Sequence, residues 1–567
     1  MTSSSNAIPD DAPLETPDAG SEQERITRRQ MLTRAAGIGL VGASFQRFGI
    51  PAPSTSANIG TTIAQAVQET EPVSGGKLRI VLQAEPDVLD PAQALAPATW
   101  KAVEHIYDTL VRMSPELAPI SGLAQTWEIN DDGTIYTFHI REDVLFHDGS
   151  PLTADDVLFT YTRILDPATR ATNFVSFLSI KGGTAFQSGQ VSTLEGIQVL
   201  DPLTLQITLE EPDASFLSVL SLGTSGILSR AFVEANNGDV SSVANGTGAF
   251  KLKGHFSGSS ITYEKNSNYW EPGLPYLDAI EATFASDDFA RSGSLIQGAS
   301  DFIEYAPLRD IDTLSNSPGI HIAGNNLNNS RYVMINLTRE PFTDLRVRQA
   351  IALAIDRAPI IEAALFGHGV AIDTLFAPSH WAGFDHEIPP PNLERARELL
   401  AEAGYPDGFS TTLITYSGFS FLVNAAIVLQ EQLKQIGIEI DFTPIETTTA
   451  VQLLIQHDFD LAVASAVAWI DPHPVVLANF GSGQFGNVVS YSNSRVDELI
   501  SEGKREIDRT ARAAIYRELQ EILLADLPWI PLYASNQYEA MKSNVRGFIH
   551  YPTGSNASLR ETWIDQS

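Results

Sequence analysis

Few residues in this chain are spaced as the active site of an enzyme would require. Gly75-Gly76-Lys77 matches the end of a phosphate-binding loop, but Glu71 stands at the first glycine position of that motif and Leu78 at its Ser/Thr position. The sequence contains no His-Glu-x-x-His and no Gly-x-Ser-x-Gly motif, and its 11 histidines are mostly dispersed. We therefore expect neither metal-dependent nor nucleophilic catalysis, and no cofactor.

Two further observations narrow the chemistry. His147 lies in a Phe-His-Asp-Gly turn, and because a single imidazole without a second ligand nearby is a poor metal site, we expect it to organise that turn. The chain has no cysteine, which excludes disulfides, thiolate metal ligands, a cysteine nucleophile and a lipobox cysteine for lipid anchoring.

The stretch from Gly122 to Leu165 has the clearest local pattern. It predicts a short strand at 127–129, a turn at Asp131-Asp132-Gly133, and a returning strand with Tyr136, Phe138 and Ile140 on one face. Thr153 and Asp156 then form a capping box ahead of apolar residues at helical spacing. We expect a hairpin followed by a helix.

Other segments alternate between strand and helix patterns. We expect strands at 77–82, 201–211, 261–264, 333–336 and 438–442, and helices at 100–110, 345–355, 393–403, 425–436 and around 515–523. Gly437 stands where a helix commonly ends in a left-handed residue. This alternation predicts an α/β layer architecture.

Length and charge exclude several classes of function. The 567 residues allow three or more domains. The 36 basic and 69 acidic residues give a net charge of −33, which argues against nucleic acid as a partner because phosphate binding needs a basic surface.

The first 66 residues are predicted to be a disordered polar segment followed by an export signal. Arg28 and Arg29 precede an apolar run rich in Gly and Ala, which resembles a twin-arginine signal peptide, and Ala64-Gln65-Ala66 offers a cleavage site. Thr55-Ser56-Ala57 is an alternative site. The apolar run falls short of the ~20 residues that a bilayer span needs, so we expect no transmembrane helix and a periplasmic or extracellular protein.

Several motifs together resemble the extracellular solute-binding proteins of the dipeptide/oligopeptide/nickel type, family 5, which serve ABC importers. Within 122–157 these are Gly-Leu-Ala, Trp, Asp-Gly, Tyr-x-Phe-x-Ile-Arg, Phe-His-Asp-Gly, Pro-Leu and Ala-x-Asp-Val. Further matches, in the family's order, are Gly246-Thr247-Gly248-Ala249-Phe250, Asn268-Tyr269-Trp270, 297–301, 342–350, Ile355-Asp356-Arg357 and 528–533. The resemblance covers roughly Gly75 to the C-terminus.

The resemblance implies a two-lobed α/β fold of the periplasmic-binding-protein class II type, with an extra domain inserted into lobe one. Lobe one would comprise 67–109, 236–327 and a returning 536–567, the inserted subdomain 110–235, and lobe two 328–535. Two lobes imply closure about a hinge near Leu327–Asn328 and near Ser535.

The same resemblance implies a ligand site around Asp471. In peptide-binding relatives an Asp shortly after a Trp pairs with the peptide ammonium, while the indole covers a side-chain pocket. Here Trp469 and Asp471 are separated by one residue where peptide binders usually have two, and His473 adds a polar group. Alternatively, Asp471 is a turn residue before Pro472.

Other predicted cleft residues rest on the same resemblance. Aromatic side chains provide contact area with a polar handle, and an arginine can meet a ligand carboxylate bidentately, although core packing or a surface ion pair would explain the same residues. These candidates are Glu85, Thr247, Phe250, Tyr305, Arg331, Tyr416 and Phe419.

The function that the resemblance implies is capture of a solute outside the cytoplasmic membrane and its delivery to ABC permease subunits. A di- or oligopeptide is the favoured ligand, with a nickel chelate, haem, an oligosaccharide or an opine-like conjugate as alternatives. We expect a monomer that meets the twin-arginine translocase during export. An exported hydrolase, a chemoreceptor adaptor and an extracytoplasmic chaperone are rival hypotheses.

The arginine pair provides a first test. Replacing Arg28 and Arg29 with Lys should leave the precursor in the cytoplasm, because the translocase reads the arginine pair. Fractionation of the native host, with immunoblotting, measures the distribution. Unchanged export of the double variant would contradict the twin-arginine interpretation.

Overall fold

A computed structural model describes residues 71–327, 329–465 and 470–566. Its central feature is a 12-stranded mixed sheet in the order β16-β15-β17-β13-β18-β11-β1-β10-β9-β8, with β12 and β14 also pairing with β18. The strands are β1 (Lys77–Leu82), β8 (Phe250–Phe256), β9 (Ser260–Lys265), β10 (Ala279–Phe284), β11 (Phe302–Ile303), β12 (Ile320–Asn326), β13 (Arg331–Ile335), β14 (Gly369–Ala371), β15 (Phe409–Tyr416), β16 (Ile438–Ile445), β17 (Leu461–Ser465) and β18 (Trp529–Lys542).

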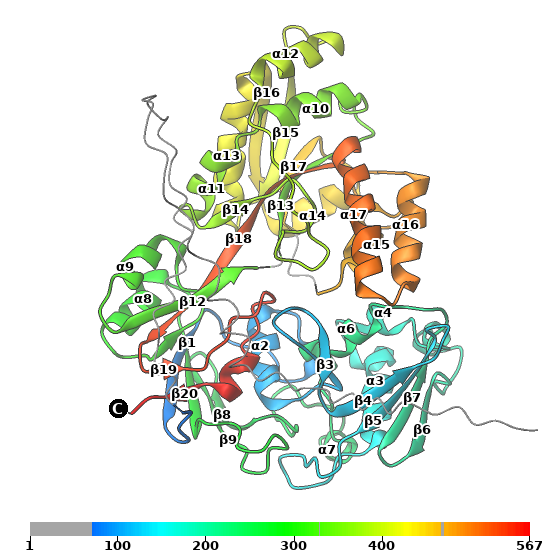
Figure 1. The fold of residues 1–567 in the computed structure, drawn as a ribbon, viewed down its shortest axis with the longest axis vertical. Coiled ribbons are helices and arrows are strands. Elements are labelled where there is room, and N and C mark those ends of the chain that lie inside the picture. The colour runs from blue at the N-terminus through cyan, green and yellow to red at the C-terminus, as the bar shows by residue number, and fades with distance from the viewer. Residues whose placement is uncertain (1–70, 328, 466–469, 567) are drawn as a thin grey trace, which may run out of the picture. The chain divides into compact units, whose positions relative to one another are not determined.

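We call the part of the chain around β1 and β8 to β12 lobe one, and the part around β13 to β17 lobe two. The strand β18 belongs to both (Figure 1). Its first half pairs with β13 and β14, and its second half pairs with β12 and β11. The predicted two-lobed α/β fold is confirmed.

The chain crosses between the lobes at two adjacent places. Leu327 donates its backbone N–H to the carbonyl of Ser535 at 3.0 Å, and Ser535 donates its N–H and hydroxyl to the Asn329 side-chain oxygen at 3.2 and 2.9 Å. These hydrogen bonds join the crossing that precedes β13 to the crossing within β18. We call this pair of segments the hinge crossings.

Helices cover both faces of the lobe-two sheet. Val333 and Ile335 pack into one core, while Tyr332 and Met334 pack into the other, as the alternation of a strand requires. The first core includes α10 (Leu345–Ala354), α11 (Arg357–Leu365), α12 (Leu393–Glu402) and α13 (Ser420–Lys434). The second includes α14 (Thr447–Ile455), α15 (Pro472–Phe480), α16 (Ser494–Arg505) and α17 (Arg509–Asp526).

A separate four-stranded antiparallel sheet in the order β4-β5-β7-β6 lies within 124–208. Tyr136, Phe138 and Ile140 of β5 are at most 4% exposed, as their alternation predicts. Thr153 and Asp156 form the predicted capping box at the start of α3, in which the Thr153 N–H donates to the Asp156 carboxylate at 3.0 Å. The elements here are β4 (Ala124–Ile129), β5 (Ile135–Ile140), β6 (Ile197–Asp201), β7 (Thr204–Thr208) and α3 (Ala154–Leu165).

The remaining elements are short, apart from α2 and α8. They are α2 (Pro97–Ile106), β2 (Val111–Met113), β3 (Pro119–Ser121), α4 (Phe174–Phe177), α5 (Gly183–Gln187), α6 (Phe216–Leu220), α7 (Arg230–Ala235), α8 (Asp288–Ile296), α9 (Ile311–Ser315), β19 (Val545–Arg546) and β20 (Trp563–Ile564). Among the described residues, none of the helices has the length and apolar character needed to cross a bilayer.

Several predicted boundaries were wrong, including the start of α13, which begins at Ser420 and not at 425. The helix expected at 100–110 is α2, which begins at Pro97, a residue suited to a first helical turn, and ends at Ile106. The strand expected at 201–211 is only Thr204–Thr208, because the chain turns at Asp201, whose carboxylate accepts the N–H of Leu203 at 2.9 Å. Gly437 follows α13 with a positive φ of 88°, as predicted.

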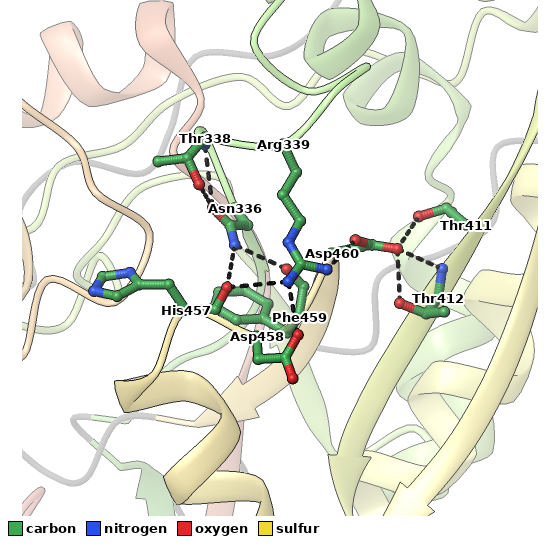
Figure 2. Close-up of polar contacts among 9 residues, drawn as sticks. All are labelled: Asn336, Thr338, Arg339, Thr411, Thr412, His457, Asp458, Phe459 and Asp460. Atoms are coloured by element: carbon green, nitrogen blue, oxygen red, sulfur yellow. Dashed lines mark hydrogen bonds and ion pairs between the residues drawn. The ribbon is translucent and has the colours of Figure 1, made fainter.

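Asn336 joins two strands of lobe two, β13 and β17, at the end of β13 opposite the hinge crossings (Figure 2). It is fully buried, donates to the carbonyls of His457 and Phe459 at 3.0 and 2.9 Å, and accepts two hydrogen bonds from Thr338. Because the two carbonyls precede β17, this amide holds the start of β17 against the end of β13.

Arg339 and Asp460 extend the same network (Figure 2). Arg339 donates to Asp458 at 2.7 Å and to Asp460 at 3.1 Å. Asp460 also accepts from the side chains of Thr411 and Thr412, at 3.1 and 2.7 Å, at the start of β15. The network therefore fixes the amino ends of β15 and β17 and leaves their carboxyl ends free of it.

Replacing Asn336 with Ala should lower the free energy of unfolding by about 2–4 kcal/mol, because the carbonyls of His457 and Phe459 lose the buried amide that donates to them. Urea denaturation followed by circular dichroism measures the loss. The exposed Asn316, which makes one hydrogen bond to its own helix, is the control, and its Ala variant should change stability by less than about 0.5 kcal/mol. Equal effects would contradict the role of Asn336.

Candidate functional site

Both lobes present the carboxyl ends of parallel strands. In lobe two β15 and β17 are parallel, so Tyr416 and Ser465 end at one edge, where antiparallel β13 begins with Arg331. In lobe one β1 is parallel to β10 and β11, and Glu304 and Tyr305 follow β11 directly. Ligands of open α/β sheets bind outside such carboxyl ends.

Three aromatic residues form a cluster at the lobe-two edge, which we call the aromatic cluster. The Tyr416 and Phe419 rings are 6.3 Å apart, and the Phe419 and Phe421 rings are 5.7 Å apart. Phe419 is 43% exposed. The cluster therefore offers an apolar, accessible surface beside the ends of β15 and β17. Contact of Tyr416 and Phe419 with a ligand stays a prediction.

Arg331 lies beside this aromatic cluster and is only 8% exposed. Its guanidinium stacks 4.9 Å from the Phe421 ring, and the hydroxyl of the neighbouring Tyr533 donates to the Phe421 carbonyl at 3.3 Å. Burial lowers the pKa of Arg331 below its usual value. The guanidinium therefore lies at the lobe-two edge in a desolvated environment.

The lobe-one edge contains a buried ion pair. Lys101 of α2 bonds to Glu304, and its ammonium lies 4.1 Å from the centre of the Tyr305 ring. Burial opposes the charge of Lys101, but Glu304 more than offsets it and raises the pKa of Lys101 above its usual value. Tyr305, at a positive φ of 47°, is thereby fixed between the lysine and the end of β11.

Glu85 lies after β1 but is already engaged within lobe one. It accepts hydrogen bonds from the Gly258 N–H at 2.8 Å and contacts the His255 imidazole at 2.8 Å. The Gly258 N–H is the main cause that lowers the pKa of Glu85. The carboxylate fastens the β8–β9 hairpin to the loop after β1.

Thr247 and Phe250 are core residues, which corrects the prediction that they line the cleft. Thr247 is 1% exposed and donates to Asp108 at 3.1 Å. Phe250 is fully buried and packs edge-on against His105 at 6.1 Å. The glycines on either side of Thr247 explain its motif, because an added Cβ would lie 2.0 Å (Gly246) and 2.6 Å (Gly248) from backbone carbonyls of α2.

His147 organises the turn in which it lies. Its Nε2 lies 3.0 Å from the Gly248 carbonyl and its N–H donates to the Gly246 carbonyl at 2.8 Å. Burial lowers the pKa of His147 to about 4, so it is neutral near pH 7. In the described part of the chain, no three His, Asp or Glu side chains are grouped as a metal site.

Asp471 is buried and paired with an arginine. Its two oxygens accept from Arg512 of α17 at 2.7 and 2.8 Å, and one also caps α15 by accepting the His473 N–H at 2.9 Å. Asp471 more than offsets the effect of burial and raises the pKa of Arg512. This geometry favours the structural alternative, in which Asp471 anchors the segment before α15. Trp469 lies outside the described residues.

A second contact links lobe two to the part of the chain that carries the inserted sheet. The Ala214 N–H donates to the Lys504 carbonyl at 2.8 Å, and the Lys504 ammonium pairs with Glu211. Arg509 donates to the carbonyl of Glu116 at 2.7 Å. Lys504 and Arg509 lie on either side of the turn between α16 and α17. We therefore call this the α16–α17 contact. No sequence motif indicated it.

The fold, with the carboxyl ends of parallel strands in both lobes, is that of a solute-binding protein of the ABC-import type, and sequence comparison gives its family. The pattern of the bacterial extracellular solute-binding proteins, family 5 Middle, matches residues 118–487, which is more than half of the chain. The chain belongs to this family. It is therefore a solute-binding receptor that acts outside the cytoplasm.

Individual relatives agree with this assignment. The glutathione-binding protein GsiB of Escherichia coli K12 is 27% identical over 475 residues, covering 82% of this chain and 90% of that protein. AgaA of A. tumefaciens R10, solved with agropinic acid, is 28% identical with a TM-score of 0.70, covering 87% and 99%. DppA of Helicobacter pylori, solved with the peptide STSA, is 26% identical with a TM-score of 0.71, covering 87% and 99%.

Replacing Asp471 with Asn should lower the free energy of unfolding by about 3–5 kcal/mol, because the cap is kept while Arg512 loses its counter-charge in a buried site. Adding Arg512→Met should recover part of that loss. The exposed Glu518, which pairs with Arg495, is the control, and its Gln variant should cost less than about 1 kcal/mol.

Urea denaturation measures the three variants and the wild type. If the Asp471→Asn variant were as stable as wild type but failed to bind a solute that carries an ammonium group, the ligand-binding interpretation of Asp471 would hold instead.

Proposed function

We propose that this receptor captures di- or oligopeptides and presents them to the permease subunits of an ABC importer. The observation that carries the proposal is the accessible aromatic cluster beside a buried, charged arginine at the carboxyl edge of lobe two. Aromatic surface binds peptide side chains and peptide planes, and a guanidinium binds the carboxylate that every unblocked peptide carries. Relatives that bind glutathione, itself a tripeptide, and the peptide STSA support the same class.

The ligand would lie between the two strand edges, in contact with the aromatic cluster and Arg331 of lobe two and Tyr305 of lobe one. Its capture would close the lobes about the hinge crossings, with 67–109, 236–327 and 536–567 moving as lobe one together with 110–235, against 328–535. Asp471 would contribute indirectly, by holding the segment that contains Trp469.

An opine-like conjugate is the second candidate ligand. AgaA, at 28% identity, was solved with agropinic acid. Such a ligand shares with peptides an acidic group that the same guanidinium would bind. The chemistry proposed at the lobe-two edge therefore suits either class.

The remaining features of the proposal concern export and assembly. We propose that the protein is exported through the twin-arginine route by Arg28 and Arg29, acts as a monomer without a lipid anchor, and catalyses no reaction. The arginine pair lies outside the described residues, so this part rests on the sequence alone.

Native mass spectrometry of protein purified from its own host identifies the bound solute, and small-angle scattering tests closure. A saturating concentration of that solute should reduce the radius of gyration, because two lobes that meet at hinge crossings close around ligand. Identical scattering curves with and without bound solute would contradict hinge closure.

A protein that retains no solute and binds none of a di- and tripeptide library by calorimetry would contradict the peptide assignment. The receptor family would be unaffected by that result, which makes the oligosaccharide, haem, nickel-chelate and opine-like alternatives the next to be titrated.

A further inference from the structure

We infer that the α16–α17 contact is a latch, a contact that favours the closed arrangement of the two lobes whichever solute lies between them. The inference rests on the lobe closure proposed above and goes beyond it. It assigns to Lys504, Arg509 and their partners the role of setting how readily the lobes close, without contact with the solute.

The α16–α17 contact lies on the cleft side of lobe two but apart from the hinge crossings. The helix α17 ends beside the start of β18, and its 18 residues span about 27 Å. Near the other end of α17, Arg512 pairs with Asp471, which follows the carboxyl end of β17. The turn before α17 therefore lies at the same edge of lobe two as the aromatic cluster.

A link away from a hinge opposes rotation about that hinge. The two hinge crossings are joined to each other by hydrogen bonds from Leu327 and Ser535, so they act as one place of attachment. While the α16–α17 contact is made, the lobes are attached at a further place and cannot rotate apart. Opening of the lobes therefore requires this contact to break.

Lobe two presents a rigid turn to the contact. Besides pairing with Asp471, Arg512 donates its Nε to the Gly503 carbonyl at 2.9 Å, directly before Lys504. Asp508 caps α17 by accepting the Ala511 N–H at 2.8 Å, directly before Arg509. Both residues that reach across the contact are thus held in place by lobe two itself.

The inserted sheet presents an equally rigid segment. The Tyr136 hydroxyl of β5 donates to the Asp213 carbonyl at 3.1 Å, and the Asp213 carboxylate accepts the N–H and hydroxyl of Ser215 at 3.0 and 2.6 Å. Ala214, which donates to the Lys504 carbonyl, lies between these two residues. Because both surfaces are preorganised, the contact forms without the entropic cost of ordering either segment.

The contact is also weak enough to break. The Glu211 side chain is 63% exposed, and an ion pair that is largely in water contributes little. Ile507 is 46% exposed, and a Cβ added to Gly133 would lie 3.1 Å from it. Among the described residues, none belongs both to the core of the inserted sheet and to the core beneath α17. Small polar interfaces of this kind allow the joined parts to move relative to each other.

The first test measures the distance between the two parts in ligand-free protein. The chain has no cysteine, so cysteines introduced at the exposed Gln198 of β6 and Glu521 of α17 would carry the only spin labels. In pulsed electron paramagnetic resonance, Lys504→Glu should shift the distance distribution to longer values, because like charges then face each other. Combining Lys504→Glu with Glu211→Lys should restore the wild-type distribution.

Coincident distributions for wild type and Lys504→Glu would overturn the inference. The same labels separate this failure from failure of the proposed closure, since wild type with its co-purified solute must show shorter distances than ligand-free wild type if the lobes close at all.

The second test measures binding of an equimolar tripeptide pool by calorimetry. Lys504→Glu and Glu211→Lys should each weaken binding by about 3–10-fold, because affinity falls with the fraction of receptor that is closed, and the double variant should bind within about twofold of wild type. The control Glu518→Lys reverses a charge that pairs with Arg495 inside lobe two and should bind like wild type.

Single-reversal variants that bind the pool as tightly as wild type would overturn the latch while the receptor function stands. If wild type binds none of the pool, the peptide assignment fails, and the distance measurement alone decides whether the α16–α17 contact is a latch.

Discussion

The two lobes share one strand, and most of the architecture depends on that constraint. Because β18 pairs with β13 and β14 at one end and with β11 and β12 at the other, the sheets of both lobes are fixed to a common backbone. The hydrogen bonds from Ser535 to Asn329 join the crossing within β18 to the crossing that precedes β13. Any motion between the lobes must therefore bend or twist the chain there, close to Arg331.

The sequence was most informative where structure depends on neighbouring residues. The alternation of Tyr136, Phe138 and Ile140 and the capping box of Thr153 with Asp156 predicted β5 and α3, because period-two burial and capping are local effects. The predicted boundaries were less accurate where a side chain stabilises a turn, as Asp201 does before β7. The family motifs predicted the two-lobed fold. Strand β18 spans both lobes through pairings as distant as Phe302 with Met541, which no local pattern encodes.

The candidate site was predicted less well, for the same physical reason. A carboxylate such as Asp471 or an aromatic ring such as Phe250 has the same local sequence whether it meets a ligand or the core. Which role such a residue has depends on the residue that it contacts, and here those residues are distant in sequence. Arg512 is 41 residues from Asp471, and His105 packs against Phe250.

The discontinuous sheet of lobe one also sets an order in which the chain can fold. The inserted sheet uses only residues 124–208 and has its own core, so its strands meet at a small entropic cost of loop closure. Lobe one instead pairs β1 with β10 some two hundred residues later, and β11 with β18 later still. Until β18 has been synthesised, β11 and β13 expose unpaired edges, which are templates for aggregation. The chain is therefore most exposed to aggregation just before its last strands are synthesised.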